Sequence, residues 1–584
     1  MKKSMLLITA LTVSAVSFAQ KKELKDVKKA IEKNEFSQAQ TLLENVKNAA
    51  LADRKSSAEY YFLKGELALK KAIAGKDVIN SLTEASTALA EARKVGGKSP
   101  SELDVLKNEG AKIAVEKVFG IEPDRVPPSI EYYDGVDYVQ VSTPKAFLIQ
   151  FLNIAGTGPI FGAIAGALWG PAAFLWIVFG CIFGGAVHDF LIGMLSLRDK
   201  GSSIGELVGQ NLGVVMQQIM RVFSIVLLLL VGVVFIKSPA DILHNLIPGV
   251  SAMTFTIIII AYYILATILP LDKIIAKIYP IFGFALLFMA IGIGGMLIYG
   301  QFTGAFAIPE VTEIFKGNPH PKGTSMFPYL FISIACGAVS GFHATQSPMV
   351  ARCIKNETEG RKVFYGAMIA EGVVALVWAA AAMTVFGGIK ELAAAGTPAV
   401  VVNKASVQLL GVFGAFLAVL GVVACPITSG DTAFRGSRLI IADIFKIKQA
   451  PIKNRFLIAI PLFIVGIYLT TIDFNIIWRY FAWANQTLAA VSLWTATVWL
   501  VKKEKPFLFA LIPSMFMTMV VTTYIVIAPE GFVRFFKNVP VHTIEFYGIL
   551  IASVVTIICT ALLFNYKHHL HGKSHHAGHL HVAK

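Results

Sequence analysis

A broken helix is predicted by the stretch Asn153-Ile154-Ala155-Gly156-Thr157-Gly158-Pro159, which lies inside a long apolar run. A proline beside two glycines cannot maintain an undisturbed helix. In the hydrocarbon of a membrane such a break persists only where protein encloses it or where it lines a watery cavity. We therefore expect the break to mark a substrate position, because an unwound stretch exposes carbonyl groups and the next half-helix directs its amino end at an anion.

The composition indicates a polytopic helical membrane protein. Hydrophobic residues make up 55% of the 584 and charged residues only 15%, far from the balance of a soluble chain. The net charge of +15 does not indicate a nucleic-acid partner, because Lys and Arg lie in short connections between apolar spans. The lipid bilayer is the expected surrounding.

About twelve spans are predicted between residues 144 and 565, all of them helical. They lie near residues 146–169, 171–195, 219–238, 251–269, 276–300, 327–349, 364–387, 407–429, 456–472, 476–501, 507–528 and 545–565. Lys and Arg concentrate after spans 2, 4, 6, 8 and 10 and in the C-terminal tail. The positive-inside rule therefore predicts that these connections and the tail are cytoplasmic.

The front of the chain has a different composition. Residues 1–19 have a basic start, an apolar run and a small-residue end, which is typical of a secretory signal peptide; an uncleaved anchor helix is the alternative. Residues 20–110 are charged, with apolar residues such as Leu24, Val27 and Ile31 at helical spacing. We expect a small soluble domain that resembles tetratricopeptide repeats and binds a protein partner, or else a helical bundle with no separate role.

The connecting segment, residues 111–143, lies in the cytoplasm by the same loop charges. A cleaved signal peptide would instead place residues 20–110 outside, and nothing between Gln20 and Thr143 is apolar enough to cross. We therefore expect either a re-entrant later span or a fusion near residues 100–112.

Substrate-binding candidates come from two broken spans and from span 10. Span 6 repeats the Phe-x-x-Ile-Ala pattern of residues 151–155 at residues 331–335, five spans later and in the opposite direction, which is expected of an inverted repeat. Asn and Gln in span 10 would donate hydrogen bonds to a substrate. The candidates are Asn153, Gly156, Thr157, Gly158, Ser340, Gly341, His343, Asn485 and Gln486.

Ion-coupling or gating candidates are charged or hydroxyl residues within or beside spans. His188 and Asp189 are adjacent, which favours a proton or cation relay, although a structural pair is the alternative. Glu371 is a carboxylate inside span 7, either a site residue or a partner in helix packing. The end of span 8 adds a group that would coordinate a cation or gate, or simply cap the helix: Thr428, Ser429, Asp431 and Arg435.

No metal site, cofactor or catalytic residue is expected. The five cysteines are scattered without close pairing. The His-rich tail, residues 566–584, could chelate zinc, nickel or copper loosely. It has no acidic or cysteine ligands at fixed spacing, so we expect a disordered tail and no specific site. The chain has no G-x-S-x-G, H-E-x-x-H or Walker pattern, so we expect neither an enzyme nor an ATP-driven pump.

Several longer strings resemble the carbon starvation protein A family of membrane transporters. They lie at residues 133–139, 156–159, 185–190, 335–343, 429–435, 478–481 and 485–487. The resemblance implies a carrier of the bacterial inner membrane that is induced by carbon starvation. It implies import of peptides or pyruvate by symport with H⁺ or Na⁺, on a scaffold of five plus five inverted-repeat spans with two more.

The front region is where the chain departs from this family. Family members open with a transmembrane helix, and here the signal peptide and the helical region stand in its place. A different class of function is also consistent with the sequence, namely a membrane sensor whose helical front domain binds a protein partner.

Overall fold

The computed structural model describes residues 23–51, 54–74, 78–95, 119–135, 138–268, 272–449, 451–535 and 539–580, and every regular element in these ranges is a helix. The predicted all-α fold is confirmed for these residues. The chain divides into two compact units, Met1–Ile121 and Glu122–Lys584. The predicted signal peptide and the predicted fusion point lie outside the described residues.

Among its described residues the first unit contains helices at residues 23–32, Phe36–Ala50 (α2), Arg54–Ile73 (α3) and Val78–Val95 (α4). Helix α4 packs in separate smaller clusters, one of which joins its Ala85 to Leu69 of α3. The apolar faces of the other three helices form one core, as the helical spacing predicts. Its buried members include Leu24, Val27, Ala30, Ile31, Ala39, Leu43, Val46, Leu63 and Leu67. The resemblance to tetratricopeptide repeats and the protein partner remain predictions.

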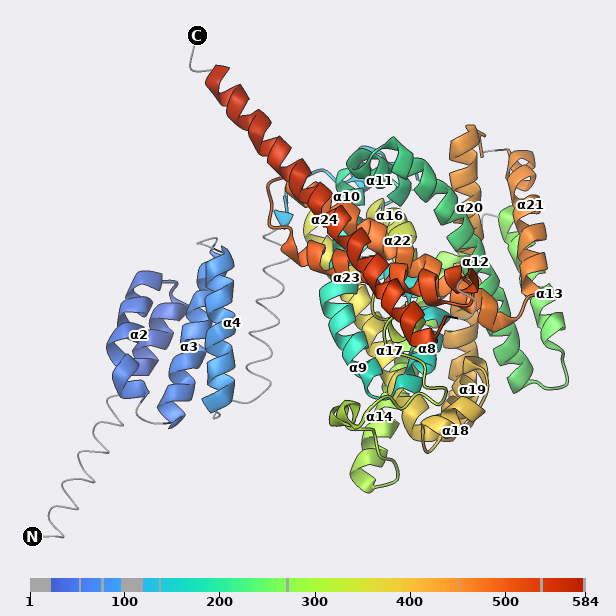
Figure 1. Ribbon diagram of the computed structural model, residues 1–584, viewed down its shortest axis with the longest axis horizontal. Coiled ribbons are helices and arrows are strands. Elements are labelled where there is room, and N and C mark those ends of the chain that lie inside the picture. Colours follow the sequence, from blue (N-terminus) through green and yellow to red (C-terminus); the bar gives the residue numbers. More distant parts are fainter. Residues whose placement is uncertain are drawn as a thin grey trace, which may run out of the picture. The chain divides into compact units, whose positions relative to one another are not determined.

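The second unit is a bundle of helices (Figure 1). The first part contains α6 (Pro128–Glu131), α7 (Thr143–Ile154), α8 (Thr157–Gly166), α9 (Ala172–Leu175), a π-helix at Trp176–Gly185, α10 (Ala186–Arg198), α11 (Ile204–Leu212), α12 (Val214–Leu246), α13 (Ala252–Ile268), α14 (Asp272–Thr303), α15 (Tyr329–Ser333) and α16 (Phe342–Ala351). The second part contains a π-helix at Arg361–Tyr365, α17 (Gly366–Val385), α18 (Ile389–Ala394), α19 (Pro398–Leu417), a π-helix at Ala418–Val423, α20 (Ala424–Phe445), α21 (Ile452–Thr470), α22 (Phe474–Lys502), α23 (Leu508–Ile527) and α24 (Val541–Leu580).

Within the described residues, seven helices are long and apolar enough to cross a membrane, or eight if the bent pair Thr143–Ile154 and Thr157–Trp169 is one span. Two shorter apolar helices, Ala252–Thr267 and Pro398–Gly414, add to them. The chain is therefore a multi-pass helical membrane protein. The count of twelve spans and the cytoplasmic side of each loop remain predictions.

The break at residues 153–159 is present. α7 ends at Ile154 and α8 begins at Thr157, and the two helices are bent by 49°. Span 6 is broken at the matching place, because α15 ends at Ser333 and α16 begins only at Phe342. The two copies of Phe-x-x-Ile-Ala thus both lie where a helix ends.

The two broken segments lie against each other. A Cβ atom on Gly158 would lie 2.6 Å from Cys336 Sγ, and one on Gly162 would lie 2.9 Å from the Ser333 carbonyl oxygen. Small residues on α8 therefore let the non-helical chain after α15 approach closely. This contact brings the first predicted substrate segment beside the second.

Two helix ends differ from their predictions. The group at residues 428–435 was expected at the end of a span, but α20 continues as helix from Ala424 to Phe445, so the group lies inside a helix.

The tail was expected to be disordered, but α24 runs from Val541 through Leu580. A helix that is already nucleated extends with one added hydrogen bond per residue, which polar side chains do not prevent.

A buried carboxylate ties the segment before α7 to the bundle. The Glu357 side chain is completely buried; its Oε2 lies 3.1 Å from Arg125 Nε, and Arg198 Nε donates to its Oε1 at 2.9 Å. Ser129 Oγ also donates to the Ile354 carbonyl oxygen at 2.6 Å. We call this set the Glu357 strap. It holds residues 125–129 against the end of α10 and the loop after α16.

Candidate functional site

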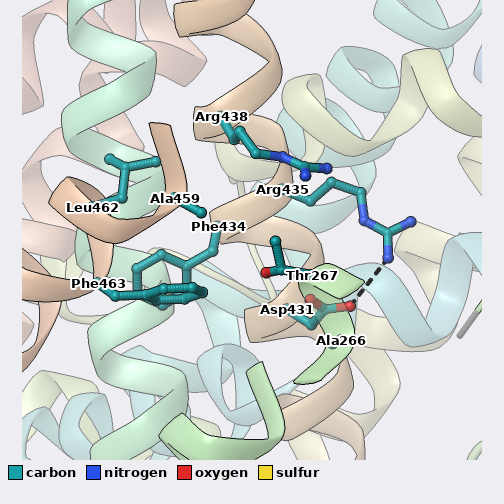
Figure 2. Close-up of a pocket in the computed structure, with 9 residues that line it drawn as sticks. All are labelled: Ala266, Thr267, Asp431, Phe434, Arg435, Arg438, Ala459, Leu462 and Phe463. Carbon is teal, nitrogen blue, oxygen red and sulfur yellow. Dashed lines mark hydrogen bonds and ion pairs between the residues drawn. The ribbon is translucent and has the colours of Figure 1, made fainter. Parts of the chain in front are cut away.

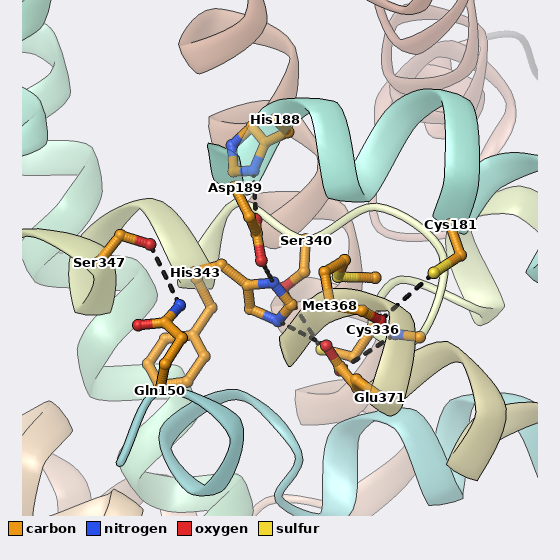
Figure 3. A network of polar contacts seen from close by, with 12 residues as sticks. Gln150, Cys181, His188, Asp189, Cys336, Ser340, His343, Ser347, Met368 and Glu371 are labelled. Atoms are coloured by element: carbon orange, nitrogen blue, oxygen red, sulfur yellow. Dashed lines mark hydrogen bonds and ion pairs between the residues drawn. The ribbon is translucent and has the colours of Figure 1, made fainter. Parts of the chain in front are cut away.

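Four ionisable side chains from three helices form one buried cluster (Figure 3). His188 and Asp189 lie on α10, His343 on α16 and Glu371 on α17, and all four are 0% exposed. We call these four residues the buried cluster. Side chains of this kind are almost never fully buried unless they are paired, so their pairing defines the site.

Asp189 stands between the two histidines. Its Oδ1 lies 2.7 Å from His188 Nδ1 and its Oδ2 lies 2.8 Å from His343 Nδ1. Each ring therefore presents an Nδ1–H to one carboxylate, which fixes the ring orientation and leaves Nε2 for another role. The adjacent His-Asp pair that the sequence singled out is present, and His343 completes it.

Glu371 lies on the opposite side of the His343 ring. Its Oε2 is 3.3 Å from His343 Nε2, and its Oε1 accepts a hydrogen bond of 3.2 Å from the Gly337 N–H. Neither His343 Nε2 nor Glu371 Oε2 has an aligned hydrogen-bond partner, so their contact is electrostatic. The broken segment after α15 thus supplies a backbone donor to a carboxylate within α17.

The charges in the cluster require compensation. Two ionised carboxylates with neutral imidazoles would bury two negative charges, and each uncompensated buried charge costs several kcal/mol. Two protons, placed on imidazoles or carboxylates, or a bound divalent cation would offset both charges. The arrangement can therefore hold and exchange a cation between Asp189, His343 and Glu371.

Asn485 on α22 organises the second break. Its Oδ1 accepts from the Phe342 N–H at 2.6 Å and from Ser340 Oγ at 3.2 Å, and its Nδ2 donates to Cys336 Sγ at 3.3 Å. Its backbone carbonyl accepts from the Gly341 N–H at 3.2 Å. Asn485, Ser340 and Gly341 thus meet, as their assignment to one site requires.

The contacts of the first break, at residues 153–159, involve α12. Ser238 Oγ on α12 donates to Thr157 Oγ1 at 3.1 Å, and Gly156 faces the Phe235 ring. Asn153 is 6% exposed. Gln486 contacts the first half of the broken span 6, because its Nε2 donates to the Phe331 carbonyl oxygen on α15 at 3.2 Å.

Two of the predicted gating residues on α20, Asp431 and Arg435, line a small cavity (Figure 2). We call Thr428, Ser429, Asp431 and Arg435 the α20 group. Arg435 Nη2 lies 3.3 Å from Asp431 Oδ2, within a cavity of about 10 Å³, which holds no more than about one water molecule. The Thr428 and Ser429 hydroxyls both donate to the Cys425 carbonyl oxygen, at 2.8 and 3.1 Å. The contacts described here for the group do not reach the buried cluster.

Sequence reasoning missed three polar residues beside the site. Cys336 lies between Gly158 and Asn485, and Gln150 Nε2 donates to Ser347 Oγ at 3.2 Å. Gln150 lies one helical turn before Asn153, so the spacing alone identifies it as a residue of the same helix face. Cys336 is seven residues before His343, but its proximity depends on the loop between α15 and α16.

A family model described as carbon starvation protein CstA matches residues 111–297, 242–389 and 377–524 of the chain. An uncharacterized membrane protein of Haemophilus influenzae is 46% identical over 314 residues, which cover 45% of this chain and 84% of that protein. Among solved structures, the nucleobase-cation-symport-1 family transporter Mhp1 superposes with a TM-score of 0.45 at 13% identity, over 76% of this chain and 96% of that one.

Two relatives have names that state a transported substrate. The peptide transporter CstA of Helicobacter pylori is 30% identical over 319 residues, covering 45% of this chain and 46% of that protein. The pyruvate/proton symporter BtsT of Escherichia coli is 28% identical over 338 residues, covering 47% and 46%. The chain thus spans less than half the length of each of these named transporters.

Proposed function

Because this chain belongs to the carbon starvation protein CstA family, we propose that it is a secondary active transporter that imports a small nutrient by ion symport. The observation that carries the proposal is the buried cluster. Asp189, His343 and Glu371 lie in contact inside the bundle, where an intramembrane ionisable residue is a functional-site candidate by default.

The cluster lies where two mobile parts of a carrier would meet. His343 follows the broken segment of span 6, and Glu371 is tied to the same segment through the Gly337 N–H. A cation that binds between them would therefore be coupled to the conformation of the break. Asn485 connects this break to α22, so the neighbouring Ser340 and Gly341 are the substrate-facing candidates.

In this conformation the four side chains of the buried cluster are closed off from solvent. Each of its four side chains is completely buried, so neither face of the membrane has access to it. Alternating access requires such a closed arrangement between an outward-open and an inward-open state.

The finer assignments belong to the same proposal. Peptides and pyruvate are the substrate candidates, because relatives are named for each. H⁺ or Na⁺ is the coupling ion, the bacterial inner membrane is the location, and carbon starvation is the inducing condition.

Uptake into proteoliposomes tests the proposal. Purified full-length protein is reconstituted into vesicles, and labelled pyruvate or a labelled dipeptide is added to the external solution. A proton gradient and a sodium gradient are then imposed in separate experiments. We expect accumulation above the external concentration under one gradient, abolished when an ionophore collapses it. Uptake that never exceeds equilibration under either gradient, or no uptake of either substrate, contradicts the proposal.

A further inference from the structure

We propose that the chain also binds a zinc-class divalent cation through the side chains of Cys336, His343 and Glu371. One ligand atom from each residue lies within 4.8 Å of the other two, and all three residues are buried. A thiolate, an imidazole and a carboxylate are the ligands that Zn²⁺ prefers in proteins. The scattered cysteine spacing had given no reason to expect this site.

The separation of two of the ligand atoms fits a single ion. His343 Nε2 and Glu371 Oε2 lie 3.3 Å apart. Two ligands about 2.0 to 2.1 Å from one tetrahedral zinc ion lie about 3.3 Å from each other. Both atoms are buried without an aligned hydrogen-bond partner, so each can offer a lone pair to a metal ion.

Each of the three ligand side chains is already held by a second residue. Asp189 Oδ2 lies 2.8 Å from His343 Nδ1, the Gly337 N–H donates to Glu371 Oε1 at 3.2 Å, and Asn485 Nδ2 donates to Cys336 Sγ at 3.3 Å. A carboxylate on the outer nitrogen of a metal-binding histidine is the usual arrangement in metalloproteins. These contacts orient the three ligand atoms toward one another.

Binding would change the protonation of the cluster. Cys336 must lose its thiol proton to the solvent, and His343 Nε2 must lose any proton it carries, because only the deprotonated forms are ligands. Three protein ligands leave one tetrahedral position open, which a water molecule or an anionic substrate group can fill. The inference goes beyond transport, since binding of the ion requires no movement of a substrate.

Cobalt provides a probe that distinguishes this site from the histidines of α24. Co²⁺ is added to chelator-treated full-length protein in detergent, and the near-ultraviolet sulfur-to-cobalt charge-transfer absorption is measured. We expect this absorption to saturate at one ion per chain, because histidine ligands alone do not produce it. Cys336→Ser should abolish it, while Cys425→Ser, at another buried cysteine, should retain it.

Asp189→Asn tests the positioning of His343. We expect it to weaken Co²⁺ binding about 10- to 100-fold, since loss of an outer partner typically has that effect, while the charge-transfer absorption remains at saturation. An unchanged affinity would contradict the role assigned to Asp189.

X-ray absorption at the zinc edge needs no variant. Wild-type protein loaded with less than one equivalent of Zn²⁺ should show a sulfur ligand at about 2.3 Å. A shell of nitrogen and oxygen alone, or charge-transfer absorption that survives in Cys336→Ser, overturns the proposal. Uptake without sulfur ligation refutes only the metal site, whereas sulfur ligation without uptake refutes only the transport function.

Discussion

The buried cluster and the α20 group contain similar side chains, yet they have different surroundings. In the cluster every ionisable side chain is completely buried. Asp189, His343 and Glu371 each contact a partner on another helix, while His188 contacts its chain neighbour Asp189. In the α20 group the Arg435 side chain remains 27% exposed and pairs with Asp431 one turn away on the same helix. The two regions therefore differ in burial, although the α20 group also contacts another helix, because Ser429 Oγ lies 3.3 Å from the Leu152 carbonyl oxygen on α7.

The largest expected effect comes from removing a charge in the cluster. Glu371→Gln or Asp189→Asn should abolish gradient-driven uptake without loss of the membrane protein, because a neutral amide cannot replace a carboxylate that holds the coupling ion. The measurement is initial uptake rate per amount of reconstituted protein. Full uptake by both variants would remove the cluster from the coupling mechanism.

The loss of stability on adding a Cβ atom at a glycine offers a second comparison of the two regions. A Cβ on Gly341 would lie 2.3 Å from the Asn485 carbonyl oxygen and 2.4 Å from the Ala489 nitrogen, both backbone atoms. We expect Gly341→Ala to destabilise the protein by about 1 to 3 kcal/mol or more. The melting temperature of the detergent-solubilised protein measures this.

Gly430 provides the comparison on α20. A Cβ there would lie 1.9 Å from the hydroxyl oxygen of Tyr263, a rigid side chain that is completely buried, so Gly430→Ala should lower the melting temperature about as much as Gly341→Ala. Gly295 has no atom within 4 Å of the added Cβ and serves as the neutral control. A larger loss for Gly430→Ala would show that the α20 region is the more tightly packed.

The smallest effect is expected for Asp431→Asn. The pair with Arg435 is partly exposed, and such pairs contribute about 1 kcal/mol or less. Uptake should therefore fall no more than several-fold, measured beside Glu371→Gln in the same proteoliposome assay. An equal loss in the two variants would mean that the α20 group is as essential as the cluster.

The apolar runs and their interruptions predicted much of the fold. The break before Thr157, the helices of the first unit and the burial of Glu371 all follow from local pattern. The helix through Asp431 was not predicted, because a cluster of polar residues looks the same at a helix end and on a helix face that is covered by neighbouring helices.

The site could be predicted only in part. His188, Asp189, His343 and Glu371 each differ from apolar neighbours in sequence, so they could be found singly. Their mutual contacts could not, since residues 188, 343 and 371 are joined only by the tertiary fold. Cys336 lies seven residues before His343, and only the loop between α15 and α16 brings the two side chains together.

The Glu357 strap has a mechanical consequence. It fastens the end of α10, which carries Asp189, to Glu357, where the continuous helical span Glu357–Val385 begins. That span includes α17 and carries Glu371. If the fastening survives the proposed transport cycle, we expect α10 and α17 to turn together as a single rigid body. The hinge would then lie between α16 and this body, and His343 would be the member of the cluster that moves away from the other three.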